Sequence, residues 1–225
     1  MDKVADTLYA LGGKQISAYP SLALGAVNMS PMEVASIYQS FSANGFHSPL
    51  RSVTAVLDKE RKPLERYSLE VGINVKPEAV ALINSALIDV TKYGTAKNLS
   101  KNLDLQVAGK TGTSDDLRDS WFAGFDNTHL AVVWVGNDDY SETGLTGATG
   151  ALAVWDEVMN QLGVEPLAEP TRELASVEYS SGLRAHADCA EVVEIPIPQG
   201  TPLQHKAGCG ITLRSVSERI RKWLQ

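Results

Sequence analysis

Residues 108–136 read AGKTGTSDDLRDSWFAGFDNTHLAVVWVG, and this stretch decides the predicted fold. Two runs rich in aromatic and β-branched residues, Ser120–Phe125 and Leu130–Gly136, follow a third strand-like run, Leu103–Lys110. Ser, Asp and Asn residues that favour turns separate the runs. The stretch therefore predicts an antiparallel sheet, with Lys110-Thr111-Gly112 where its first strand ends.

Amphipathic segments on both sides of this stretch predict helices that pack on the sheet. Ser30-Pro31-Met32-Glu33 is typical of a helix start, with a serine N-cap, a proline at the first helical position and a glutamate that completes a capping box. Pro77–Thr91 and Gly150–Leu162 also carry apolar residues at helical spacing. The predicted buried faces of the three helices are Val34, Ile37, Tyr38 and Phe41; Val80, Ile83, Leu87 and Val90; and Leu152, Val154, Trp155, Val158 and Met159.

Smaller elements complete this part of the chain. Residues 2–11 predict a short helix. Residues 51–58 and 64–68 predict a hairpin with a solvated, charged turn between them. The polar segment Gly136–Gly147 predicts an exposed loop; the alternative is that it borders a groove beside the Lys-Thr-Gly motif.

Composition and charge limit the class of protein. Of 225 residues, 44% are hydrophobic and 21% are charged, as in ordinary globular chains. The net charge of −7 argues against nucleic acid as a partner, because phosphate binding needs a cationic surface. No run of about 18 apolar residues is present, so no membrane span is expected. No leader peptide follows Met1, and we expect that residue 1 is not the natural start of the protein.

Several motifs within residues 1–162 carry a resemblance to a known family. They are Pro20–Ala26, Met29–Ala35, Tyr93–Ala96, Gly109–Gly136 and Gly147–Ala151. Together they resemble the transpeptidase domain of class A penicillin-binding proteins, the bifunctional cell-wall synthases, in which Lys-Thr-Gly is one of three active-site motifs. The tail with its two cysteines is similar to that of the 1B type found in gram-negative bacteria.

The resemblance implies an α+β fold: an antiparallel sheet packed by helices, with Lys-Thr-Gly at its edge, as in an incomplete penicillin-binding protein or serine β-lactamase. It implies that residues 1–162 are the C-terminal portion of the transpeptidase domain. Residues 163–225 are then a small appendage, with strands near Val177–Tyr179 and Ala190–Ile195. A basic helix is expected at 215–223 with a solvated face; the alternative is contact with anionic lipid or glycan.

The resemblance also implies a reaction. In that family a serine attacks the amide between two D-alanines of a peptidoglycan stem peptide, and an amine of a neighbouring stem takes the acyl group. Penicillin resembles the substrate and acylates the same serine. The implied parent is a D-alanyl-D-alanine transpeptidase and peptidoglycan glycosyltransferase, anchored at the periplasmic face of the inner membrane. Its implied partners are stem peptides, β-lactams, the rest of its own chain and other cell-wall synthesis proteins, and no cofactor or metal is expected.

The family pattern assigns substrate binding to Lys110, Thr111, Gly112 and Thr113, and their neighbour Ser114 is included with them. A substrate carboxylate needs a cation and hydroxyl groups, which Lys110, Thr111 and Thr113 supply. Gly112 lets ligand and backbone approach closely. The strand around Thr113 offers backbone groups to an extended peptide, including one oxyanion-hole donor. The three aspartates that follow are expected to be turn residues.

The other two motifs of the family are missing. No lysine in the chain has a serine three residues before it, so the Ser-x-x-Lys nucleophile is absent. Ser-x-Asn has two matches, Ser42-Ala43-Asn44 and Ser100-Lys101-Asn102. We reject both, because the first ends a helix and the second lies in a polar loop. The chain alone is therefore expected to be inactive, with no catalytic residue of its own.

Two other functions stay open. One is a serine β-lactamase or β-lactam sensor domain of the same superfamily, which needs the same missing nucleophile. The other is a non-catalytic binding module that uses the half-site only for protein contacts. The motifs outside Lys-Thr-Gly favour the synthase.

Cys189 and Cys209 lie in the tail. A periplasmic location favours a disulfide between them, which would contribute about 3 kcal/mol to stability. The alternative is a pair of free thiols in a cytosolic protein. A zinc site with His186 and His205 is not expected, because the chain has no Cys-x-x-Cys pair.

Overall fold

The computed structural model describes residues 1–99, 106–168, 173–186, 189, 191–197, 200 and 202–205. The chain divides into two compact units, Met1–Pro170 and Thr171–Gln225. The segment 163–168 belongs to the first unit, and its Leu167 backbone N–H donates to the Gln106 carbonyl oxygen at 2.8 Å.

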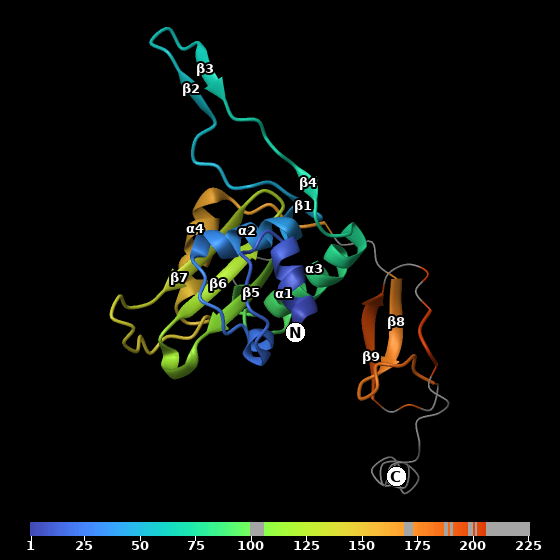
Figure 1. Cartoon of the computed structure of the whole chain (residues 1–225). Helices are drawn as coiled ribbons and strands as arrows, with labels where there is room; N and C mark the ends of the chain where they lie inside the picture. Colours follow the sequence, from blue (N-terminus) through green and yellow to red (C-terminus); the bar gives the residue numbers. More distant parts are fainter. Residues whose placement is uncertain are drawn as a thin grey trace, which may run out of the picture. The chain divides into compact units, whose positions relative to one another are not determined.

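A three-stranded antiparallel sheet of order β5-β6-β7 forms the centre of the first unit (Figure 1). Its strands are β5 (Ala108–Thr113), β6 (Ser120–Phe125) and β7 (Leu130–Val135). The predicted second and third strands are confirmed. The predicted first strand is displaced: Lys-Thr-Gly lies inside β5, because each of its residues pairs with a residue of β6, and residues 103–105 lie outside the described part.

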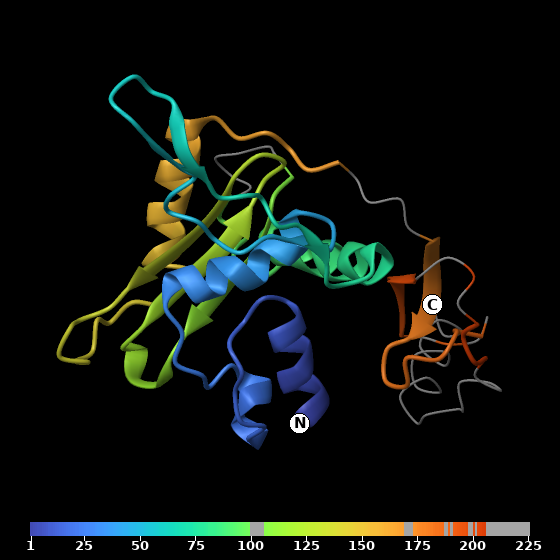
Figure 2. The ribbon, with the colours of Figure 1, turned by 45° about the horizontal axis from the view of Figure 1, so that its top comes forward.

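Helices cover both faces of this sheet (Figures 1 and 2). They are α2 (Pro31–Ser42), α3 (Pro77–Lys92) and α4 (Ala151–Leu162), and α1 (Asp2–Ala10) and the 3-10 helix η1 (Pro20–Leu24) precede them. Strand alternation separates the faces. Phe122 packs on Trp155 of α4, whereas Phe125, three residues later, packs with Tyr38 and Phe41 of α2. The predicted α+β architecture is confirmed. No helix in the described residues is long and apolar enough to span a membrane.

Local sequence signals set the limits of α2 as predicted. The Ser30 hydroxyl accepts from the Glu33 backbone N–H at 3.3 Å, and the Glu33 carboxylate accepts from the Ser30 N–H at 2.7 Å. Asn44 and Gly45 both have left-handed φ, 52° and 91°, which ends the helix. Ser42 is thus the last residue of α2, as expected when its Ser-x-Asn match was rejected.

The predicted buried faces of α3 and α4 are partly wrong. Leu152, Trp155 and Met159 are buried, but Val154 and Val158 are 46% and 42% exposed. Ile83 of α3 is 44% exposed. Each helix touches the sheet along a narrower stripe than the full apolar face that helical spacing allows.

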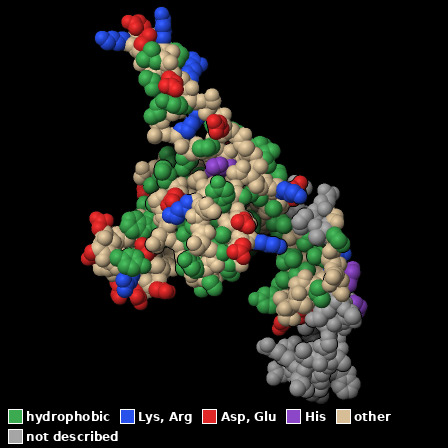
Figure 3. Space-filling view, in the orientation of Figure 1, with side chains coloured by type: hydrophobic (Ala, Val, Ile, Leu, Met, Phe, Trp, Pro, Cys, Tyr) green, Lys and Arg blue, Asp and Glu red, His purple; other side chains and the backbone are tan. Residues whose placement is uncertain are grey.

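Short hairpins extend the first unit. Strand β1 (Phe46–His47) pairs with β4 (Gly72–Ile73), and β2 (Ala55–Leu57) pairs with β3 (Pro63–Arg66). The predicted hairpin is confirmed, but its strands are shorter. It projects beyond the helices, and charged side chains gather at its tip (Figures 1 and 3).

The second unit contains an antiparallel pair, β8 (Glu173–Glu178) and β9 (Val192–Ile197). Ala175, Val177 and Ile197 form its small apolar cluster. Strands are present near both predicted segments, but β8 lies mostly before Val177–Tyr179, and β9 is shifted by two residues toward the C-terminus from Ala190–Ile195. Cys209 and the predicted helix at 215–223 lie outside the described residues.

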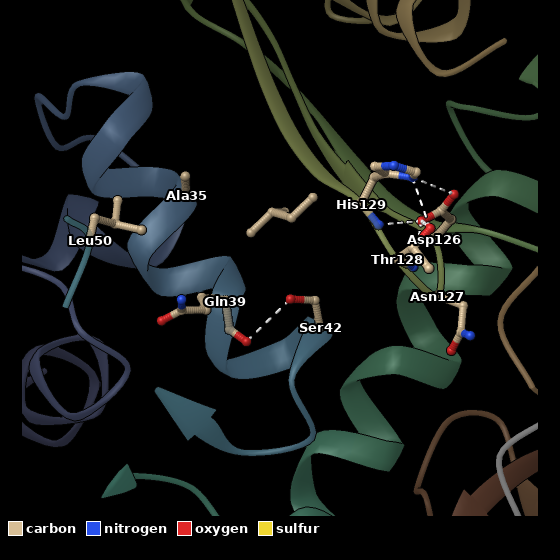
Figure 4. Close-up of a pocket in the computed structure, with 9 residues that line it drawn as sticks. Ala35, Gln39, Ser42, Leu50, Asp126, Asn127, Thr128 and His129 are labelled. Atoms are coloured by element: carbon tan, nitrogen blue, oxygen red, sulfur yellow. Dashed lines mark hydrogen bonds and ion pairs between the residues drawn. The ribbon is translucent and has the colours of Figure 1, made fainter. Parts of the chain in front are cut away.

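A buried carboxylate fixes the β6–β7 turn. Asp126 is 2% exposed and accepts from the backbone N–H groups of Thr128 and His129 (Figure 4). It also accepts from the backbone N–H of Glu165, after α4. Burial raises the pKa of Asp126, but the hydrogen bonds from Glu165, His129 and Thr128 outweigh it, so the pKa of this carboxyl lies below its ordinary value. The ionised form therefore stabilises the turn and ties the segment after α4 to it.

Replacing Trp155 tests the α4 face of the core. Its indole is fully buried, lies 5.1 Å from the Phe122 ring and donates to the Ala131 carbonyl oxygen at 3.1 Å. We expect Trp155→Ala to lower the free energy of unfolding by about 3–5 kcal/mol in urea denaturation. The control Val158→Ala, on the exposed side of α4, should change it by less than about 0.5 kcal/mol. Equal losses in the two variants would contradict this packing.

Replacing Asp126 tests the turn through pH. Because its folded pKa is lowered, its stabilising effect is present above the unfolded value of about 3.9 and is lost as the pH falls through the folded value. Asp126→Asn should be less stable than the wild type at pH 7, and the difference in unfolding free energy should shrink below about pH 4. The exposed Asp115→Asn serves as control. Parallel pH profiles for wild type and Asp126→Asn would count against the assignment.

Candidate functional site

Strand β5 divides the Lys-Thr-Gly-Thr side chains between the two faces of the sheet. Thr111 pairs with Phe122, so it lies on the α4 face, and Thr113 follows on that face. Lys110 pairs with Ala123 and lies on the opposite face. Its exposed ammonium donates to the Thr111 carbonyl oxygen at 2.8 Å. Among the described strands, β5 has β6 as its only strand neighbour, so no described strand pairs with its other edge, and such an edge can add an extended peptide as a further strand.

The turn after α3 reaches the Lys-Thr-Gly strand. At Gly94 a Cβ would lie 2.9 Å from the Val90 carbonyl oxygen, so only glycine allows this close turn. Ala96, two residues on, is fully buried in the α4 core. Thr95 between them places its hydroxyl 2.6 Å from that of Thr111. The turn therefore joins the core to the site.

The loop before α4 rests on the same strand. The Gly147 backbone N–H donates to the Thr113 hydroxyl at 2.9 Å. A Cβ at Gly147 would lie 2.6 Å from the carbonyl oxygens of Gly112 and Trp121, so the two backbones are in direct contact. Ser120, fully buried, donates to the Thr146 carbonyl oxygen and accepts from the Ala151 N–H, both at 2.8 Å. These bonds fix the start of α4 over Lys-Thr-Gly.

The β5–β6 turn contains Ser114 and the 3-10 helix η3 (Asp115–Leu117). The Ser114 hydroxyl accepts from the Asp119 backbone N–H at 2.8 Å, so within this structure it closes the turn. The Thr143 hydroxyl donates to the Leu117 carbonyl oxygen at 2.6 Å. The loop 136–147 thus lies against the turn that follows Thr113, and both border the same end of the strand.

Acidic side chains gather on these two loops (lower left of Figure 3). The exposed ones are Asp115, Asp116, Asp138, Asp139 and Glu142. Arg118 lies among them, 3.2 Å from the Asp116 carboxylate and 4.9 Å from the centre of the Tyr140 ring. Lys110 lies on the strand itself, one residue from Thr111 and three residues from Thr113.

The structure brings the five predicted binding residues together on one strand and the turn after it. It adds Thr95, Gly147 and Ser120, which the motif did not predict. Thr95 and Gly147 lie in segments that carried the family resemblance, but only the structure shows which atoms they meet. Within the described part of the chain, no three His, Cys, Asp or Glu side chains come together as metal ligands do.

A separate pocket of about 390 Å³ lies between α2 and the β6–β7 turn (Figure 4). Gln39, Ser42, Leu50 and His129 are among its lining residues, and none comes from β5. The Asp126 carboxylate at its edge accepts hydrogen bonds from the turn itself. The pocket is therefore not part of the Lys-Thr-Gly site.

Substitution of Gly147 tests the contact between loop and strand. Because its Cβ would press on two backbone carbonyls, we expect Gly147→Ala to cost about 1–3 kcal/mol and to speed amide hydrogen exchange in β5 and β6. Gly144→Ala, in the same loop, meets no atom within 4 Å and carries only the penalty of its left-handed φ of 70°. In the Gly144→Ala variant, the amides of β5 and β6 should exchange at the wild-type rate. Unchanged exchange in Gly147→Ala would refute the contact.

The sequence of this chain matches a known protein family. The model of the penicillin-binding protein transpeptidase domain matches residues 12–154. Penicillin-binding protein 1B of Haemophilus influenzae is 35% identical over 171 residues, which cover 75% of this chain and 22% of that protein. Its counterpart in Vibrio cholerae is 34% identical over 205 residues, which cover 88% and 26%. The chain thus spans about a quarter of the length of these relatives.

Solved structures share the fold. The crystal structure of penicillin-binding protein 1A from Haemophilus influenzae has a TM-score of 0.76 at 20% identity, covering 92% of this chain and 38% of that one. The PonA1 protein of Mycobacterium tuberculosis, in complex with penicillin V, has a TM-score of 0.58 at 20% identity, covering 74% and 52%. The family match, the sequence relatives and the fold agree: the chain belongs to the penicillin-binding protein transpeptidase family.

Proposed function

We propose that this chain supplies one side of the active site of a peptidoglycan synthase, a serine-type D-alanyl-D-alanine transpeptidase that binds penicillin. The observation that carries the proposal is the Lys-Thr-Gly-Thr sequence on β5, beside a strand edge to which no described strand pairs. An anionic, extended peptide needs a cation, hydroxyl donors and backbone partners together, and this strand has all three.

Each candidate residue has a separate role in this proposal. The Thr111 and Thr113 hydroxyls, which share the α4 face, bind the terminal carboxylate of the stem peptide or of penicillin. The long Lys110 side chain leaves β5 on the opposite face, and its exposed ammonium reaches the same carboxylate past the strand edge. The backbone N–H of Thr113 stabilises the oxyanion that forms when the serine attacks the carbonyl. Gly112 keeps the strand free of a side chain on the Lys110 face. Ser114 closes the turn and holds Thr113 at the end of the strand.

The nucleophile belongs to a part of the protein outside these 225 residues. No Ser-x-x-Lys is present, so the serine and its lysine must be brought to this strand by another segment. The acyl-enzyme then forms on that serine, the D-alanine amine leaves, and the amine of a second stem takes the acyl group. This chain alone binds no penicillin covalently.

The wider setting of the protein follows from the same family. The resemblance to class A penicillin-binding proteins leads us to propose a membrane-anchored synthase with a periplasmic catalytic domain and a glycosyltransferase domain. Stem peptides, β-lactams and cell-wall synthesis proteins are its proposed partners. In this setting a transpeptidase portion at 1–162, an appendage at 163–225 and a Cys189–Cys209 disulfide remain our proposals.

Intact mass spectrometry with penicillin tests the proposal. The 225-residue chain should show no covalent adduct, and the protein extended to carry its Ser-x-x-Lys segment should show one adduct per molecule. In the extended protein, Lys110→Ala should slow acylation by about ten- to a hundredfold, because a hydrogen bond from a charged group to the carboxylate is lost. Lys62→Ala, in the solvated hairpin turn, should leave the rate unchanged.

Other outcomes identify the rival functions. An extended protein that never acylates is a non-catalytic binding module. Rapid release of hydrolysed penicillin from the adduct identifies a β-lactamase. An adduct on the 225-residue chain overturns the assignment of the nucleophile to another segment.

A further inference from the structure

The two threonine hydroxyls of the Lys-Thr-Gly-Thr strand each form a hydrogen bond on the α4 face of the sheet. Thr95 lies 2.6 Å from Thr111, oxygen to oxygen, and the Gly147 backbone N–H lies 2.9 Å from the Thr113 oxygen. Both partners come from loops on the α4 face of the sheet. These are the hydroxyls that the proposed function assigns to the substrate carboxylate.

The chemistry of a hydroxyl decides what these contacts do. A threonine hydroxyl has one proton to donate and two lone pairs that accept. Because the Gly147 N–H can only donate, the Thr113 oxygen accepts from it and keeps its own proton. Within the described residues, no protein acceptor for that proton is found near Thr113. This hydroxyl therefore keeps a proton that it can donate to a ligand.

The Thr95–Thr111 pair has two possible directions, since either hydroxyl can donate. A carboxylate accepts only, so a bound substrate requires the Thr111 proton. Thr95 must then donate to Thr111, which gives the relay Thr95 to Thr111 to carboxylate. Hydrogen bonds in such a chain polarise and strengthen one another.

We propose that Thr95 is a positioning residue for the substrate carboxylate: it donates to Thr111 so that Thr111 donates to the anion, as Gly147 does for Thr113. This inference rests on the proposed function and adds a residue outside the Lys-Thr-Gly motif to it. The position of Thr95 is held from both sides, by the close turn at Gly94 and by the buried Ala96. A hydroxyl fixed in this way loses little freedom when the substrate binds.

Penicillin acylation in the extended protein tests the role of Thr95. We expect Thr95→Val, which keeps the shape and removes the hydroxyl, to lower the acylation rate constant over the dissociation constant about tenfold. Thr95→Ser should stay within about twofold of the wild type, because it keeps the donor. Thr95→Val added to Thr111→Val should cause no further loss, because the relay is already broken.

A penicillin ester separates positioning from a structural role. The ester has no carboxylate, so Thr95→Val and the wild type should acylate with it at equal rates. An equal loss with penicillin and its ester, or a Thr95→Ser variant that fails to recover the rate, would overturn the proposal. Thermal unfolding of each variant shows whether it folds. If Thr95→Val does not fold, the acylation rate of Thr95→Ser, compared with the wild type, decides the outcome.

The same experiment distinguishes the two proposals. If the wild-type extended protein is not acylated by penicillin, the proposed function fails and this inference fails with it. If the wild type is acylated and Thr95→Val matches it, only the positioning role of Thr95 is overturned.

Discussion

The antiparallel pairing of β5 with β6 sets the positions of Lys110, Thr111, Gly112 and Thr113. Six pairs run in unbroken register from Ala108 with Phe125 to Thr113 with Ser120. A slip of one residue would exchange the faces, moving Lys110 to the α4 side and both threonines away from Thr95 and Gly147. The fully buried Phe122, packed edge-on against Trp155, supports the register because a slip that turned its ring away would lose this contact.

A pair of glycines lets α4 come close enough to make that contact. Gly109 and Gly124 face each other across β5 and β6. A Cβ on Gly109 would lie 2.5 Å from the Phe122 ring, and one on Gly124 would lie 3.1 Å from the Trp155 indole. The missing side chains leave room for both aromatic rings. The core and the site therefore share strand β5, with the aromatic contact at one end and the threonine hydroxyls at the other.

The charge around the site limits how a substrate is recognised. The chain carries a net charge of −7, and acidic side chains crowd the two loops beside Thr113. Such a surface repels an anion at long range, and salt at physiological strength screens this repulsion beyond about 8 Å. In the proposed function, recognition of a carboxylate therefore depends on direct contact with Lys110 and the two threonine hydroxyls. This makes the geometry of Thr111 and Thr113 more important than electrostatic steering.

Much of this protein is determined by local sequence. The runs rich in aromatic and β-branched residues predicted β6 and β7, the capping box predicted the start of α2, and Lys-Thr-Gly with its neighbours identified the family and the proposed binding strand. Each of these signals depends on residues a few positions apart, whose backbone preferences and hydrogen bonds are satisfied locally. Helical periodicity was a weaker guide, because it permitted Ile83, Val154 and Val158 to be buried while the sheet covers only part of each helix.

Only the tertiary structure decided which groups contact the threonine hydroxyls of β5 on the α4 face. Thr95 is 16 residues from Thr111 and Gly147 is 34 residues from Thr113, and nothing in those intervals indicates which atoms will meet. Ser120 likewise reads as an ordinary strand residue, yet it holds the start of α4. These contacts arise because packing α4 and the turn after α3 on one face of the sheet brings distant polar groups together. The sequence determined which residues form the proposed site, and packing decided which polar groups meet their hydroxyls.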